Sequence, residues 1–494
     1  MRYISTRDKD AHGVSSAYAI KTGLASDNGL FMPDVIPSIT LNEIEDLTEK
    51  SYPERAAYVL AKYLNDYTVD ELTEDAEGAY SREKFSDFPA KLTKMNDGNF
   101  MLELWHGPTC AFKDMALQIM PRLFVRALRK CGEDRCALIL VATSGDTGKA
   151  ALEGYCDVAG TKVKVFYPIN GVSKVQKLQM QTQTGANVSV TGIVGNFDDA
   201  QTGVKEIFAD EHVCALLDKD GVFLSSANSI NWGRLVPQIV YYVSAYCDMV
   251  KCGAIKLGES IDVCVPTGNF GNIFACYLAK LMGTPIKKLI CASNENDVLT
   301  EFLASGVYDR NRVFHTTMSP SMDILISSNL ERLLFVALGA EKTAHYMKKL
   351  SSEGRYALSD EDFAKISTDF LGYSASEEQT AKTIKETYEN KNCLIDPHTA
   401  VAMYATERYK KENKAERRIL TVSTASAYKF AADVYTSLTG DKPTDELEAL
   451  NMLQALTGEP IPAPLKGLGQ KEALHTSVIS KTDMRDAVSK FAKG

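Results

Sequence analysis

The stretch Cys136–Lys149, CALILVATSGDTGK, joins a run of apolar residues to a loop of hydroxyl and glycine residues that leads into a helix pattern. Residues Cys136–Thr143 predict a strand, and residues Thr147–Val158 predict an amphipathic helix. A strand, a loop and a helix in this order form the repeating unit of parallel α/β sheets. The stretch therefore predicts an α/β fold, in which ligands bind beyond the carboxyl ends of the strands.

The same alternation continues on both sides of this stretch. Further strands are predicted at Phe100–Trp105, Lys162–Pro168, Val188–Val194, Ile261–Pro266, Lys287–Ser293 and Arg418–Ser423. Further helices are predicted at Met115–Lys130, Lys174–Thr184 and Leu235–Val250. This order indicates mostly parallel sheets that are covered on both faces.

Three regions are expected in a chain of 494 residues. Residues 1–95 contain acidic helix patterns such as Leu41–Lys50 and Ala56–Asn65, and they predict an N-terminal helical domain or cap. Residues 96–240 and 241–494 predict two α/β domains. The second of these ends, after a proline-rich connector at Pro460–Pro464, in a helical extension near Asp483–Ala492.

Composition excludes several kinds of protein. The net charge of -9 argues against a general nucleic-acid binder, and no apolar run approaches the ~20 residues that span a bilayer. The eleven cysteines form no C-x-x-C pair, and Cys131/Cys136 and Cys247/Cys252 have no neighbouring histidines at metal-ligand spacing, so reduced thiols are favoured over a zinc site. We therefore expect a cytoplasmic protein without a metal centre or a membrane partner.

Lys113 is the first candidate for chemistry, in the loop His106–Asp114, HGPTCAFKD. Its neighbours Ala111, Phe112 and Met115 are apolar. Lost hydration lowers the pKa of a lysine and frees its amine to attack a carbonyl. A surface lysine whose stem lies on apolar residues is the alternative interpretation.

Two further loops could bind anions. Ser144, Asp146 and Thr147 lie in the loop that opens the helix after Thr143, where a carboxylate or a phosphate would suit the helix N-terminus. Simple helix capping by Ser144 or Asp146 is the alternative. The loop Pro266–Asn272, PTGNFGN, offers glycine amides that can converge on a phosphate. A reactive lysine, a hydroxyl loop and a glycine cup together suit pyridoxal phosphate.

Six motifs resemble those of the threonine synthases, in the same order. They are HGPTxAFKD, SGDTG, NSIN, PTGNFGN, DPHTA and STASxYKF, and Ser15–Phe31 adds a further match near the N-terminus. The chain is most similar to the long bacterial and fungal branch. The resemblance implies a fold-type II pyridoxal-phosphate enzyme with two open, mostly parallel-sheet α/β domains and an additional helical N-terminal domain.

The resemblance also implies roles for individual residues. Lys113 would form the Schiff base, and Gly268, Asn269, Phe270, Gly271 and Asn272 would hold the cofactor phosphate. Thr424 would face the pyridine nitrogen, and Asp146 takes the place of an asparagine that shorter relatives have near the phenolic oxygen. Ser144 and Thr147 would bind the substrate carboxylate, and Asn228, Ser229 and Arg234 would bind its phosphate. His398 is expected to have a structural role. For Arg234, a surface salt bridge is the alternative.

The implied reaction turns O-phospho-L-homoserine and water into L-threonine and phosphate by γ-elimination and β-addition of water. Lys113 would act as general base and acid once the substrate amine has displaced it. The alternative is a related dehydratase or phospholyase that acts on another hydroxy or phosphorylated amino acid. A pyridoxal-binding protein without activity is a more distant possibility, and a monomer or homodimer is expected.

Overall fold

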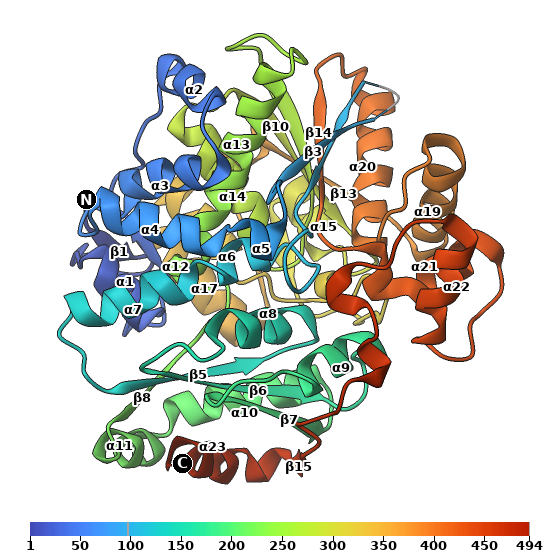
Figure 1. Ribbon diagram of the computed structural model, residues 1–494. Helices are drawn as coiled ribbons and strands as arrows, with labels where there is room; N and C mark the ends of the chain where they lie inside the picture. Colours follow the sequence, from blue (N-terminus) through green and yellow to red (C-terminus); the bar gives the residue numbers. More distant parts are fainter. Residues whose placement is uncertain (96–97, 494) are drawn as a thin grey trace.

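The structure is a computed structural model, and it describes residues 1–95 and 98–493. Five parallel strands form the lower sheet in Figure 1, in the order β15-β7-β6-β5-β8. The strands are β5 (Cys136–Ala142), β6 (Thr161–Pro168), β7 (Val188–Val194), β8 (Val222–Ser225) and β15 (Val478–Ser480). Along β5, Leu138 and Leu140 belong to one apolar cluster, whereas Ile139 and Val141 belong to another. Both faces of this sheet are therefore buried, as the continuous apolar sequence of β5 requires.

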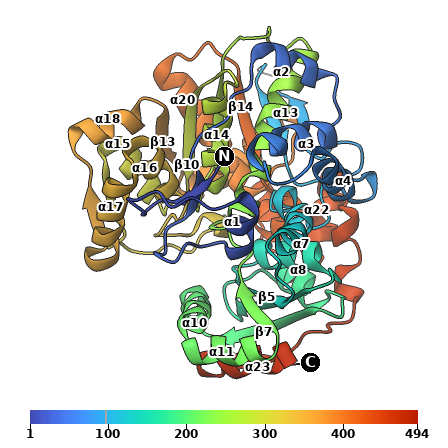
Figure 2. The same cartoon turned by 90° about the vertical axis from the view of Figure 1, so that its left-hand side faces the viewer.

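Helices cover the two faces of this sheet. On one face lie α8 (Asp146–Tyr155) and α9 (Lys174–Gln181). On the other face lie α10 (Phe197–Ala209), α11 (Glu211–Lys219) and the C-terminal helix α23 (Met484–Lys493), at the bottom of Figure 2. The C-terminal segment thus returns to a sheet that is otherwise built from residues 136–225.

Six strands form the second sheet, in the order β13-β10-β9-β14-β4-β3. The strands are β3 (Lys91–Lys94), β4 (Phe100–Glu103), β9 (Ile261–Pro266), β10 (Ile286–Ser293), β13 (Phe370–Ser374) and β14 (Ile419–Ser423). All pairs are parallel except β3 with β4, which are antiparallel. The helices α13 (Pro237–Lys251) and α14 (Gly271–Met282) lie on one face, and α20 (Pro397–Asn413) covers the other.

Residues 1–95 pack against α13 and α7 (Met120–Lys130), and most of their helices lie on the left in Figure 1. Three successive helices of this region begin with a capping box, at Thr40, Ser51 and Thr68. In each, the hydroxyl of the capping residue accepts from the backbone N–H of the glutamate three residues later, and the carboxylate of that glutamate accepts from the backbone N–H of the capping residue. The elements of this region, other than β3, are β1 (Tyr3–Ser5), α1 (Ser16–Thr22), β2 (Phe31–Pro33), α2 (Leu41–Thr48), α3 (Tyr52–Tyr63), α4 (Val69–Ala79) and α5 (Arg82–Phe85). The region is mainly helical, but β1 and β2 form a small antiparallel sheet.

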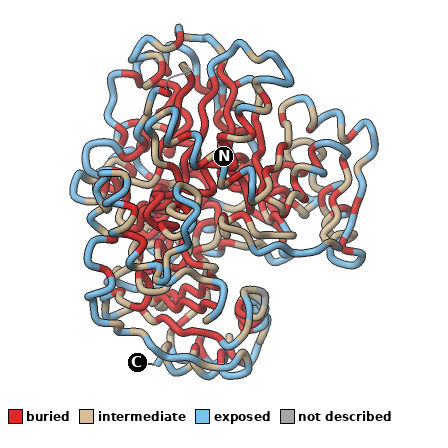
Figure 3. Tube along the Cα trace, turned by 90° about the vertical axis from the view of Figure 1, so that its right-hand side faces the viewer, coloured by how far each residue is buried: buried red, intermediate tan, exposed pale blue. Residues whose placement is uncertain are grey.

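The remaining elements lie outside the two sheets. They are α6 (Asp114–Leu117), α7 (Met120–Lys130), α12 (Trp232–Leu235), α15 (Val298–Ser305), β11 (Val307–Asp309), η1 (Pro320–Met322), α16 (Leu330–Leu338), α17 (Ala340–Glu353), β12 (Arg355–Ala357), α18 (Asp360–Ser367), α19 (Glu377–Lys391), η2 (Ala427–Phe430), α21 (Ala431–Thr439), α22 (Glu448–Thr457), η3 (Ala463–Leu465), η4 (Leu468–Gln470) and η5 (Lys481–Asp483). Figure 3 shows that buried residues concentrate in the interior of the molecule, whereas exposed residues lie at its periphery. None of the described helices is long and apolar enough to cross a membrane.

All seven predicted strands are present, with ends that differ by a few residues. The helix predicted at Met115–Lys130 is two helices, α6 and α7, with Pro121 in the first turn of the second. The expected regions 96–240 and 241–494 do not coincide with the two sheets. β4 falls within residues 96–240, but it pairs in the six-stranded sheet, most of whose strands come from residues 241–494. The domain boundaries themselves stay a prediction.

Candidate active site

Lys113 lies at the start of α6 and is 7% exposed, so the interpretation as a surface lysine is wrong. Its Nζ donates to Asp146 Oδ2 and to Ser321 Oγ, both at 3.0 Å, and lies 4.7 Å from the centre of the Phe112 ring. Burial lowers the pKa of Lys113 and outweighs the opposing effect of Asp146. The amine therefore loses its proton more readily than an exposed lysine does.

The turn before Lys113 is fixed by buried hydrogen bonds. The carboxylate of Asp114 accepts from the backbone N–H of Thr109 at 2.8 Å and from its hydroxyl at 2.7 Å. Burial raises the pKa of Asp114 to about 7. The N–H of Phe112 donates to the carbonyl of Thr424 at 2.8 Å, which ties this turn to the end of β14. These bonds hold the lysine in place from both sides.

Asp146 is buried at the start of α8. Burial raises the pKa of this carboxyl, but the ammonium groups of Lys113 and Lys429 outweigh burial and hold it well below its usual range. The helix is capped by Thr143, whose Oγ1 accepts from the amides of Gly145 and Gly148 at 3.0 and 2.9 Å. Asp146 is therefore not needed as the cap, and its charge faces Lys113 instead.

The loop Gly268–Asn272 opens helix α14, and the amides of Asn269–Asn272 donate to no described residue. Such amides at a helix N-terminus suit a phosphate. A Cβ on Gly268 would lie 2.6 Å from the carbonyl oxygen of Ser321, so only glycine fits there. The loop is held by the Asn272 side chain, which donates to the Pro266 carbonyl at 2.8 Å.

Thr424 follows β14 and is buried beside the lysine turn. Its hydroxyl makes no hydrogen bond within residues 1–95 and 98–493. The preceding residue, Ser423, is instead fixed, because its Oγ accepts from Trp105 Nε1 at 2.9 Å and from the Thr399 hydroxyl at 3.0 Å. The hydroxyl of Thr424 is thus available to a ligand.

Arg234 is buried in α12 and forms no ion pair with any carboxylate of the described chain, so the interpretation as a surface salt bridge is wrong. It donates to the carbonyl of Ala227 at 2.9 Å and to the hydroxyl of Thr147 at 3.3 Å. Burial lowers the pKa of Arg234 to about 10, so it stays charged at neutral pH. The structure thus joins Arg234 to one of the two residues expected to bind the substrate carboxylate. The other, Ser144, is half-buried in the same loop.

Ser229 lies on the side of the glycine cup. Its Oγ accepts from Asn329 Nδ2 at 3.0 Å, and the same amide donates to the carbonyl of Asn269 at 2.9 Å. Asn228 is half-buried next to Ala227, and its side chain bonds to none of the described residues. The Asn228-Ser229 pair therefore runs from the Arg234 contact to the cup.

Sequence reasoning missed Ser321, Asn329 and Lys429. Ser321 and Asn329 lie in no motif that we singled out and are far from Lys113 in the sequence, whereas Lys429 is the lysine of the STASxYKF motif. His398 has the structural role that was expected. Its Nδ1 lies 2.7 Å from Asp396 Oδ2, and its Nε2 accepts from the amide of Ser321 at 3.1 Å, which holds Ser321 against Lys113.

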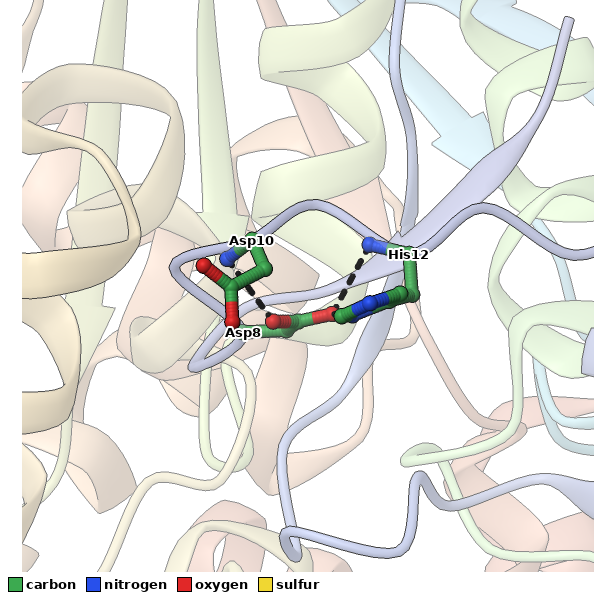
Figure 4. A group of neighbouring side chains, drawn as sticks. All are labelled: Asp8, Asp10 and His12. Atoms are coloured by element: carbon green, nitrogen blue, oxygen red, sulfur yellow. Dashed lines mark hydrogen bonds and ion pairs between the residues drawn. The ribbon is translucent and has the colours of Figure 1, made fainter.

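Asp8, Asp10 and His12 form the one group in the described chain that is close enough to hold a metal ion (Figure 4). The carboxylate of Asp8 accepts from the amides of Asp10 and His12 at 2.9 and 2.8 Å. These local bonds explain the cluster as a turn. All eleven cysteines are free thiols, and none belongs to that group.

The fold and the site define a class of enzyme. Residues 91–425 match the family described as pyridoxal-phosphate dependent enzyme, and residues 2–80 match the family described as threonine synthase N terminus. The chain is 41% identical over 458 residues to threonine synthase-like 1 of Pongo abelii, covering 88% of this chain and 60% of that protein. The chain thus spans about 60% of the length of that relative.

Two further relatives match over nearly their whole length. Threonine synthase of Pseudomonas aeruginosa is 38% identical over 452 residues, covering 90% of this chain and 92% of that protein. The crystal structure of PLP-bound threonine synthase from Brucella melitensis is 34% identical and superposes with a TM-score of 0.88, covering 100% of both chains. The chain belongs to the threonine synthase family of pyridoxal-phosphate dependent enzymes.

Proposed function

We propose that this protein uses pyridoxal phosphate to convert O-phospho-L-homoserine and water into L-threonine and phosphate. The observation that carries the proposal is a buried guanidinium near the reactive amine. Arg234 has no carboxylate partner in the described chain, yet it bonds the Thr147 loop next to Asp146. A buried guanidinium with free donors suits a dianionic phosphate.

The residues present fit the cofactor. Lys113 would bind it through Nζ, Gly268 and the free amides of Asn269–Asn272 would take its phosphate, and the hydroxyl of Thr424 would face its ring nitrogen. Asp146, which is ionised, can only accept a hydrogen bond near the phenolic oxygen. When bound, pyridoxal phosphate supplies an electron sink for the charge that remains when a proton leaves Cα.

The chain's own groups would do the remaining work. Ser144 and Thr147 would bind the substrate carboxylate, and Asn228, Ser229 and Arg234 would bind the phosphate that leaves from Cγ. The free amine of Lys113 would move protons at Cα and Cβ before water adds at Cβ, because its lowered pKa makes the unprotonated amine easier to form.

The purified protein, supplied with pyridoxal phosphate, should release phosphate from O-phospho-L-homoserine and form threonine in equal amounts. The related dehydratase or phospholyase is the competing proposal. Formation of a 2-oxo acid from serine or threonine, without threonine from phosphohomoserine, would favour a dehydratase and overturn the proposal.

Lys113→Ala should abolish threonine formation, because no neighbouring group can replace an amine that both binds the cofactor and transfers protons. Borohydride reduction should fix the cofactor covalently on Lys113 of the unaltered protein. Lys149→Ala is a matched control, since Lys149 pairs with Glu153 at 2.7 Å and contacts none of the proposed site residues. Cofactor fixed on another lysine would refute the assignment.

We also propose a cytoplasmic monomer or homodimer with no nucleic-acid partner. We further propose that the chain is divided into three domains, with boundaries at residues 95/96 and 240/241. The net charge of -9 supports the absence of nucleic acid. Gel filtration at several protein concentrations tests the oligomeric state.

A further inference from the structure

Asp146 lies between two buried ammonium groups. Its Oδ2 accepts from Lys113 Nζ at 3.0 Å, and its Oδ1 lies 2.7 Å from Lys429 Nζ and accepts from Gln176 Nε2 at 2.8 Å. The side chains of Asp146 and Lys429 are 2% and 0% exposed. One carboxylate therefore serves two lysines in a place where water screens little of the charge.

Lys429 belongs to η2, five residues after Thr424 in the sequence. Besides Asp146, it donates to the carbonyl of Thr109 at 2.9 Å, in the turn before Lys113. Lys429 thus contacts both loops that frame Lys113, without contacting Lys113 itself within hydrogen-bond distance.

The two lysines compete for one negative charge. The charged groups around the amine of Lys113 are Asp146, Lys429 and Arg234, and its other polar contact is Ser321. A carboxylate alone would raise the pKa of Lys113, whereas the positive charges of Lys429 and Arg234 lower it, in addition to the larger effect of burial. Without the charge of Lys429, the negative charge of Asp146 would act on Lys113 alone and would raise the pKa of Lys113.

We propose that Lys429 is a positioning residue that neutralises Asp146, so that Lys113 gives up its proton more readily than it would beside Asp146 alone. This inference rests on Lys113 as the amine that binds the cofactor. The competing explanation is structural: Lys429 would only hold the two loops together through its hydrogen bonds. The two explanations differ in whether charge or hydrogen bonding matters.

Lys429→Gln separates them, because glutamine can still donate to Thr109 and Asp146 but carries no charge. The measurement is the rate at which cofactor-free protein takes up pyridoxal phosphate, followed by absorbance across pH. Loss of a neighbouring charge shifts a pKa by about one unit or more, so uptake at pH 7 should slow about tenfold and approach the wild-type rate at high pH. The midpoint is the pH at which the uptake rate is half of its maximum. Lys429→Arg keeps the charge, so its midpoint should stay close to that of the unaltered protein.

Lys149→Gln is the matched control, because it removes a nearby lysine charge that is paired with Glu153 rather than Asp146. Its midpoint should not move. A wild-type pH profile for Lys429→Gln, or equal slowing at every pH, would overturn the proposal in favour of the structural role.

Should Lys429→Gln fail to fold, the pair Asp146→Asn with Lys429→Met removes opposite charges together. Lys113 then loses its carboxylate, and its midpoint should fall to the wild-type value or below. A midpoint above the wild-type value would refute the proposal. Borohydride reduction and peptide mapping in each variant distinguish this failure from a wrong assignment of Lys113, because the cofactor would then be fixed on a different lysine.

Discussion

Arg234 joins two loops that lie far apart in the sequence. It bonds the Ala227 carbonyl, next to Asn228, and the hydroxyl of Thr147, next to Asp146. A single guanidinium therefore lies between the proposed sites for the substrate phosphate and carboxylate. Its remaining donors have no carboxylate partner in residues 1–95 and 98–493, which leaves it free for a substrate anion.

Arg234→Leu should lower kcat/KM for O-phospho-L-homoserine about 100-fold or more, a loss of about 3 kcal/mol, because the substrate phosphate is left partly unpaired. Turnover of serine should fall less, since only the contacts with Ala227 and Thr147 are lost. Steady-state kinetics on both substrates measure the difference. Equal losses on both substrates would mean that Arg234 only supports the loops. Arg234→Lys tests whether a positive charge suffices without the forked donors of the guanidinium group.

The sequence identified the site residues that lie in recognisable motifs, but not the contacts between distant segments that complete the site. Lys113 and Asp146 belong to motifs, and their residue types point to their chemistry. The contact of Lys113 with Ser321 joins residues 208 positions apart. No local pattern reveals such a contact, because it depends on how η1 lies over the glycine loop. Lys429 belongs to the STASxYKF motif, but its apolar neighbours in the sequence do not indicate that it faces Asp146.

At the scale of elements, most of the strands that were not predicted are short, and the longest of them is β13, with 5 residues. β13 (Phe370–Ser374, FLGYS) was not predicted, and it contains a glycine, a residue that usually weakens a strand. Here Gly372 is required, since a Cβ would lie 2.7 Å from the Cα of Thr300 in α15. Close packing of a helix on a strand therefore decides this residue, and a sequence does not show which helix will pack there.

β6 carries a buried lysine that faces α23. Lys164 Nζ donates to Ser189 Oγ at 2.9 Å and to Thr191 Oγ1 at 3.0 Å, and lies 5.3 and 5.4 Å from the ring centres of Phe166 and Phe491. Burial lowers the pKa of Lys164 to about 8. Unfolding restores the ordinary, higher pKa, so the folded state loses stability as the pH falls from about 10.5 to 8, and below 8 the loss is constant because the amine is protonated in both states.

Lys164→Met should therefore stabilise the protein at pH 7 by on the order of 2 kcal/mol, and this gain should shrink as the pH rises from 8 towards 10.5. Urea denaturation at several pH values measures it. Lys162→Met is the control on the same strand: Lys162 donates to the carbonyls of Phe491 and Ala492 at the end of α23, so its loss should destabilise. A gain for Lys164→Met that does not depend on pH would contradict the explanation.

For the whole molecule, the C-terminal segment completes the five-stranded sheet. β15 pairs with β7 in parallel, and Val488 of α23 is fully buried in the cluster formed with α10 and α11. Val488→Asp should destabilise the five-stranded sheet by about 4 kcal/mol, because it buries an unpaired charge.

Hydrogen exchange should show faster exchange in β5–β8 of this variant than in the six-stranded sheet. Lys490→Asp, at an exposed position of the same helix, should cost less than about 1 kcal/mol. Uniform loss of protection in both sheets would instead mean that the two sheets unfold as one unit.

The pairing of β15 with β7 also has a consequence for synthesis on the ribosome. β7 ends at Val194, whereas β15 begins only at Val478. At about 5–20 residues per second, translation needs tens of seconds to cover that interval. During this time the nascent chain carries an open strand edge and the uncovered apolar face that α23 later protects, which are the features that chaperones bind. Production of this protein should therefore depend on chaperone supply more than its finished stability suggests.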